Sequence, residues 1–135
     1  MRVLILSLVV AGAMAAGAEA AAPTRSLLSG SEIRRDATIG FWRRYEVLRL
    51  DPNGTLSGNY ERTRPVTRGK QERLVGDIRG RWSFEAGKLC FEGSGLEYKG
   101  RSCYAITRHG YSDNEYSGTH DRTGDVWRFF IYPGN

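Results

Sequence analysis

Residues 77–84 alternate without a break between apolar or glycine positions and polar positions. The first set is Ile78, Gly80, Trp82 and Phe84, and the second is Arg79, Arg81 and Ser83. A period of two places alternate side chains on opposite faces of a β-strand. The segment therefore predicts a strand in a sheet with one face against a core and the other in solvent.

Further segments with strand character follow one another between turn signals. They are residues 41–50, 55–60, 88–91, 101–107, 111–118 and 126–132. Asn53-Gly54 is typical of a tight hairpin turn, because such turns need positive φ values. No segment between the strands has the length and 3.6-residue period of a crossover helix. We therefore expect an all-β fold, an antiparallel meander of about seven strands that forms a small lipocalin-like barrel or a curled sheet.

One short helix is expected in front of the barrel. Ser29 precedes Glu32 by three residues, which fits the capping-box pattern and predicts a helical turn through Ile33 and Arg35. Inside the barrel, side chains at period two are expected to fill the core, although a cavity lined by them is the alternative. These side chains are Trp82, Phe84, Trp127, Phe129 and Ile131.

The N-terminus has the pattern of a secretory signal peptide. Arg2 precedes an uncharged apolar run over residues 3–18, and Ala18 and Ala20 fit the small-residue cleavage rule. Cleavage is expected after Ala20, with Ala22 and an uncleaved anchor as alternatives. The predicted organisation is a signal peptide at 1–20, a flexible leader at 21–28 and a single β domain at 29–135. The product is expected to be periplasmic or secreted, and not integral to a membrane.

The chain has two cysteines, Cys90 and Cys103. In an oxidising compartment an isolated pair at this spacing most often forms a disulfide. The closed loop of about 14 residues would stabilise the fold by about 3 kcal/mol on the chain-entropy estimate. The alternative, two free catalytic thiols, lacks the C-x-x-C spacing.

Positive charge is concentrated in one polar segment. The chain has a formal net charge of +5, and residues 61–76, here called the basic arm, contain five cations. These are Arg62, Arg64, Arg68, Lys70 and Arg73. With Pro65 and Gly69, the segment predicts a long loop or flared hairpin tip. It could contact lipopolysaccharide, anionic lipid or an acidic protein, or be an ordinary solvated loop. Nucleic acid is not expected, because no aromatic residues are interleaved with the cations.

Neither a catalytic nor a metal-binding motif stands out. His109 and His120 are the two histidines, which is too few for a metal site once both cysteines are paired. No G-x-S-x-G elbow surrounds Ser57 or Ser94. We therefore expect a non-enzymatic protein without a cofactor. The alternative to a non-enzymatic protein is a small hydrolase whose serine, histidine and aspartate come together only in the folded chain.

Four segments, taken in order, resemble a family of small exported proteobacterial proteins of unknown function. They are residues 28–34, 53–58, 80–91 and 102–104. The resemblance implies an envelope location and a Cys90–Cys103 pair, but no activity and no ligand.

A fifth segment, Ser94-Gly95-Leu96-Glu97-Tyr98, is similar to the S-G-x-x-Y stretch of periplasmic lysozyme inhibitors. Those inhibitors are small disulfide-bearing β-barrels. The family's later Trp and Lys-Gly segment does not follow at the expected distance, because Lys99-Gly100 comes at once. This similarity implies an alternative function, inhibition of a secreted or host enzyme such as lysozyme.

Overall fold

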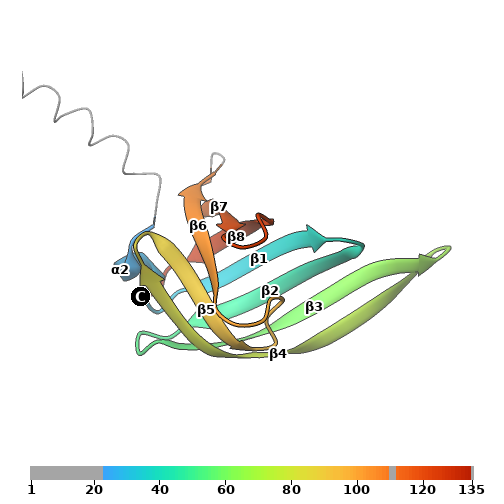
Figure 1. Ribbon diagram of the computed structural model, residues 1–135, viewed down its shortest axis with the longest axis horizontal. Coiled ribbons are helices and arrows are strands. Elements are labelled where there is room, and N and C mark those ends of the chain that lie inside the picture. Colours follow the sequence, from blue (N-terminus) through green and yellow to red (C-terminus); the bar gives the residue numbers. More distant parts are fainter. Residues whose placement is uncertain (1–22, 110–111, 135) are drawn as a thin grey trace, which may run out of the picture.

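The chain folds into a closed antiparallel barrel in which each strand pairs with the next and β8 returns to pair with β1 (Figure 1). The computed structural model describes residues 23–109 and 112–134. The predicted signal peptide lies outside the described residues, as does the start of the strand predicted at 111–118. Among the described residues, no helix has the length and apolarity needed to cross a bilayer.

Eight strands and one very short helix make up the described fold. They are α2 (Arg25–Leu28), β1 (Glu32–Ile39), β2 (Trp42–Leu50), β3 (Thr55–Thr67), β4 (Lys70–Glu85), β5 (Lys88–Ser94), β6 (Ser102–Arg108), β7 (Glu115–His120) and β8 (Val126–Tyr132). The predicted all-β antiparallel barrel is confirmed, with eight strands in place of about seven.

The additional strand, β1, occupies the place where a helical turn was expected. That placement was wrong: the helix α2 lies earlier, within the predicted leader, where Thr24 caps it through a bond from the Leu27 amide. Residues from Glu32 onward pair instead with both β2 and β8, which closes the barrel. The strand was hidden because Arg35, a charged residue, stands at a position that faces the interior.

The side chains that were predicted from the alternating pattern to fill the barrel interior do point into it. Trp82, Trp127, Phe129 and Ile131 are all buried, whereas Phe84 is only partly buried at the edge of the core. The helix α2 closes one end of the barrel with Leu28, which is fully buried. An eight-stranded barrel is just wide enough for side chains to fill it, and this one is filled in that way.

The β3–β4 hairpin extends well beyond the rest of the barrel (Figure 1). β3 has 13 residues and β4 has 16, and they pair as far as Thr67 and Lys70. β2 accompanies β3 only as far as the Arg43–Thr63 pair. Of the two forms predicted for the basic arm, the flared hairpin is therefore the one observed.

Cys90 and Cys103 lie directly opposite each other on β5 and β6 and form a disulfide with an S–S distance of 2.09 Å. The predicted pairing is confirmed. The bridge joins two neighbouring strands, and the loop between them, residues 95–101, is held at both ends.

Candidate functional site

The five predicted site residues all lie on the β3–β4 hairpin, but its pleat divides them. Arg62 and Arg64 point to the same side as the ring of Trp42, with guanidinium carbons 4.5 and 4.7 Å from the ring centre. Arg73 lies on the other face, beside Glu61. Arg68 and Lys70 flank the turn at Gly69, where φ is +71°.

Two of the five cations are neutralised within the hairpin itself. Arg64 bonds Glu72 across the β3–β4 pair at 2.8 Å, and Arg73 bonds Glu61 diagonally at 2.6 Å. Such cross-strand pairs hold the two strands in register. Their net stabilisation is small, because all four side chains are well exposed to solvent.

The tip of the arm retains its positive charge. Arg68 and Lys70 are exposed, and neither forms an ion pair with any residue that the structure describes. The arm has five cations and two carboxylates of its own, and a third carboxylate, Glu97, lies 3.8 Å from Arg62, which leaves two net positive charges at the tip. A projecting ribbon of this charge is accessible to an anionic surface and attracts it.

Trp42 is a site residue that the sequence reasoning missed. It was assigned only to a strand, although it stacks against two guanidinium groups at the root of the arm. Cation–π contacts of this kind favour arginine, whose planar group lies flat on an aromatic face. The stacking fixes the direction of Arg62 and Arg64 and leaves the tip of the arm free.

A chain of ionic contacts connects the arm to the barrel centre. Arg62 Nε lies 3.8 Å from Glu97 Oε1, and Arg44 Nη1 lies 3.5 Å from the same oxygen. Arg44 also donates to Glu46 Oε2 at 2.5 Å and to the carbonyl of Gly95. We call Arg35, Glu46, Arg44, Glu97 and Arg62 the ionic chain.

The inner end of the ionic chain is fully buried. Arg35 donates to Glu46 Oε1 at 2.6 Å, and the two side chains are 1% and 0% exposed. Four aromatic rings surround the guanidinium, with centres 4.1 to 5.4 Å away: Trp127, Tyr104, Phe91 and Phe129. Burial alone would lower the pKa of Arg35, but Glu46 and Tyr104 together outweigh it and the pKa is raised. The cation at the barrel centre is therefore permanent.

The loop after β5 contains the segment that is similar to lysozyme inhibitors, and it folds onto the barrel. Leu96 and Tyr98 pack against the core. The Tyr98 hydroxyl donates to Asp125 at 2.5 Å and accepts from Trp127 Nε1 at 3.2 Å. Burial and the bond to Asp125 raise the pKa of Tyr98. The Tyr98 side chain is thus held against the barrel with its hydroxyl group protonated.

His120 is buried beneath that loop. Its ring lies 3.9 Å from the ring of Tyr98, and its Nδ1 accepts from the amides of Arg122 and Thr123. Nε2 therefore carries the proton of the neutral ring. Burial lowers the pKa of His120, with the nearby Arg122 adding to the effect. Among the described residues, neither histidine side chain bonds a serine or an aspartate.

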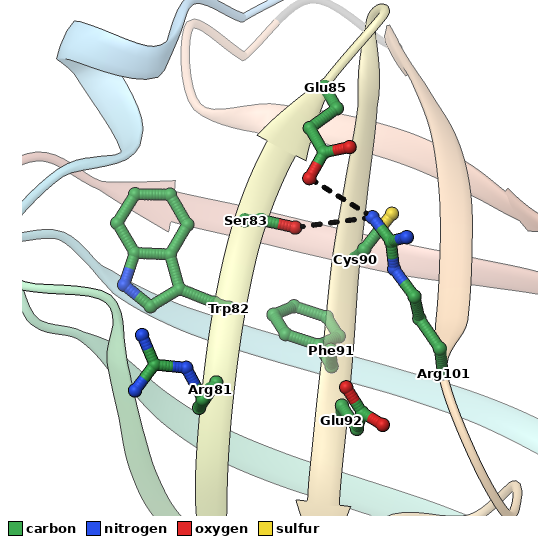
Figure 2. A pocket seen from close by; sticks show the side chains of 8 residues that line it. All are labelled: Arg81, Trp82, Ser83, Glu85, Cys90, Phe91, Glu92 and Arg101. Atoms are coloured by element: carbon green, nitrogen blue, oxygen red, sulfur yellow. Dashed lines mark hydrogen bonds and ion pairs between the residues drawn. The ribbon is translucent and has the colours of Figure 1, made fainter.

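A hollow of about 260 Å³ lies beside the disulfide on β4 and β5. Figure 2 shows Arg101 reaching across it to Ser83 and Glu85, at 3.5 and 3.2 Å. Its charged lining residues are Arg81, Arg101, Glu85 and Glu92, so the charges balance. This hollow lacks the excess of positive charge that distinguishes the basic arm.

No family model and no curated protein matches the chain. The candidate site thus rests on its own geometry. In that geometry a ribbon rooted in Trp42 and the ionic chain projects from a filled barrel, and the exposed cations at its tip form no ion pair within residues 23–109 and 112–134.

Proposed function

We propose that this chain is an exported, non-enzymatic binding protein, lipocalin-like in outline, which attaches to anionic envelope material through the basic arm. The observation that carries the proposal is the pair Arg68 and Lys70. Both are exposed at the end of the projecting hairpin without an ion-pair partner among the described residues. Cations held away from their own carboxylates are free to bind phosphate or sulfate groups of a partner.

The filled interior supports a surface site over an internal one. Trp127 and Phe129 are fully buried, and the guanidinium of Arg35 occupies the space between their rings. Four hollows among the described residues have volumes of about 260 to 330 Å³, and none of these four is lined by both Trp82 and Trp127. A lipocalin ligand would need such an enclosed space.

The disulfide supports export. A bridge between Cys90 and Cys103 is compatible with an oxidising compartment, where such bonds persist. The apolar run at residues 3–18 supplies the expected export signal. Outside the cytoplasm, the anionic partners available to a basic protein include envelope lipids and polysaccharides as well as acidic proteins.

The test compares two double variants that lower the net charge equally. Arg68→Glu with Lys70→Glu removes the tip cations, and Arg79→Glu with Lys88→Glu changes two exposed cations on the barrel wall. Binding is measured to dextran sulfate, a soluble anionic polymer. We expect the tip variant to lose at least about tenfold in affinity, since each cation contributes about 1 kcal/mol near an anionic surface. Equal losses in both variants would show that the charge acts non-specifically and would overturn the proposal.

A further inference from the structure

Exposed apolar side chains gather at the end of the molecule that bears the basic arm. Seven large hydrophobic residues are exposed among those described, and five of them lie in residues 40–45 and 61–75. We call these two segments the flared end. The five are Phe41, Tyr45, Val66, Leu74 and Val75. Exposed apolar side chains in one region of a protein often mark a site that contacts a partner or a membrane.

The most exposed of these side chains lie at or beside the tips of two hairpins. Phe41 lies in the turn between β1 and β2 and is 86% exposed, and Val66 precedes the turn between β3 and β4 and is 49% exposed. Both turns point to the same side of the molecule, with the β3–β4 turn the farther out (Figure 1). The two tips can therefore meet one surface together.

The apolar groups of the flared end occupy both faces of the β3–β4 ribbon. Leu74 and Val75 are neighbours in β4, so they point to opposite faces, and they are 43% and 60% exposed. A flat protein surface would cover only one of these faces, whereas a fluid lipid boundary can adapt to both.

Cations surround these apolar tips. Arg43, Arg68 and Lys70 are exposed and form no ion pair with the residues described, while Glu61 and Glu72 are each held by an arginine. Apolar tips with exposed cations beside them in the chain are the composition of segments that lie in the interface of anionic membranes.

We infer that the flared end docks on the surface of an anionic lipid bilayer. Phe41 and Val66 enter the boundary between headgroups and acyl chains, while Arg43, Arg68 and Lys70 contact lipid phosphates. This inference rests on the proposed function and identifies its anionic partner as phospholipid. The barrel itself stays in water, since its own core is already filled by Trp82, Trp127 and their neighbours.

The test uses the processed protein, its N-terminus checked by intact mass, and vesicles of phosphatidylglycerol and phosphatidylcholine or of phosphatidylcholine alone. The test variant is Phe41→Ser with Val66→Ser. The matched control is Val126→Ser with Tyr132→Ser, which removes two exposed apolar side chains of β8, 61% and 41% exposed. Co-sedimentation gives the partition coefficient, and dextran sulfate binding is measured in parallel.

We expect the wild type and the β8 control to bind the phosphatidylglycerol vesicles and to bind phosphatidylcholine at least about tenfold less. The tip serine variant should lose about tenfold or more of its vesicle binding, because two apolar anchors are gone. Its binding to dextran sulfate should not change. In a Phe41→Trp variant, brominated lipid should quench more fluorescence than in the wild type.

Different failures have different meanings. Unchanged vesicle binding by the tip serine variant, or no extra quenching at position 41, would overturn bilayer docking and leave the proposed function intact. If the wild type binds dextran sulfate but binds none of the vesicles, bilayer docking is also overturned and the proposed function again stays intact. That result would favour an acidic protein or a polysaccharide as the partner. If Arg68→Glu with Lys70→Glu changes neither kind of binding, the proposed function itself is wrong.

Discussion

Arg35 lies at the centre of the barrel, although arginine is almost never fully buried without a partner. Its partners here are one carboxylate and four aromatic rings. Its Nη1 has no hydrogen-bond partner among the described residues, so the rings provide its remaining contacts. Glu46 bonds both Arg35 and Arg44, so two buried cations share this carboxylate, and Arg44 also lies 3.5 Å from Glu97.

Replacing that carboxylate with its neutral isostere tests how much the ionic chain matters. Glu46→Gln keeps the shape but leaves two buried guanidinium groups short of negative charge. We expect the free energy of unfolding, measured with urea, to fall by about 3–5 kcal/mol, as when one partner of a buried ion pair is removed. Glu32→Gln, on a partly exposed ion pair, is the control and should cost less than about 1 kcal/mol.

A second variant separates charge from packing. Arg35→Met with Glu46→Met replaces the inner pair with apolar groups, while Arg44 keeps Glu97. Buried ion pairs are often replaced by apolar residues at little cost, so this double variant should be more stable than Glu46→Gln alone. If the double variant is the less stable one, the cost comes from packing and the electrostatic account is wrong.

His120 gives the fold a defined response to acid. Its pKa is lowered in the native state, so between that value and the ordinary value of 6.5 the unfolded chain binds more protons. Its contribution to stability is therefore complete above about pH 6.5 and is lost as the pH falls through the native pKa. His120→Asn, whose side-chain oxygen can still accept from Arg122 and Thr123, should remove this part of the pH dependence.

The measurement is the urea unfolding free energy of both proteins at about pH 5 and about pH 7.5. The loss on acidification should be smaller in His120→Asn than in the wild type. His109→Asn, at an exposed position, serves as the matched control. Parallel pH profiles for the wild type and His120→Asn would exclude a role for this buried ring.

At the scale of elements, the disulfide links β5 and β6, which have among the fewest paired residues in the barrel. Four residue pairs join these strands, whereas twelve join β3 and β4. Cys90→Ala with Cys103→Ala should lower the free energy of unfolding by about 3 kcal/mol, because the loop is no longer closed in the unfolded chain.

Reduced wild-type protein is the natural control for that variant. If the disulfide acts only by constraining the unfolded chain, reduction and the double substitution should lower the free energy of unfolding by similar amounts. Two titratable thiols in the native, unreduced protein would contradict the pairing itself.

The strand at residues 77–84 was predicted well because its inward positions are all apolar or glycine, and β2 was predicted from its aromatic and aliphatic residues although Arg44 and Glu46 face inward. Residues 77–84 have that pattern, and Ile78 and Trp82 are indeed buried at the predicted parity. β1 has the same period, but Arg35 stands on its inner face. A charged residue at an inward position looks like a solvent-facing one until the pairing partner is known, and Glu46 is eleven residues away.

The sequence predicted which segment contains the candidate site, but it did not predict how the side chains of that site are arranged. The five cations of residues 61–76, together with Pro65 and Gly69, indicate an exposed arm from composition alone. Which cations stay unpaired depends on the β3–β4 register, which brings Arg64 opposite Glu72. Phe41 was assigned to a strand because it is aromatic, yet it occupies an exposed turn. Nothing in the neighbouring sequence shows whether an aromatic residue such as Phe41 lies in a strand or in an exposed turn.

The whole molecule has two unlike ends. At one end, α2 closes the barrel with Leu28, and the interior is apolar around Ile33, Leu48 and Leu50. At the other, the ionic chain leads outward to a ribbon with apolar tips and free cations. Bilayer docking as proposed would use this polarity, and it requires that no second apolar segment compete with the flared end.

The apolar run at residues 3–18 would be such a competitor if it remained attached. We therefore predict that the exported protein begins at Ala21, because Ala18 and Ala20 satisfy the small-residue rule for cleavage. Intact mass of the native product should match residues 21–135 with two hydrogens missing for the disulfide. Ala18→Arg with Ala20→Arg should block processing and leave the chain in the membrane fraction. A native product that retains Met1, or normal processing of the arginine variant, would contradict both the cleavage site and the free, oriented molecule that bilayer docking requires.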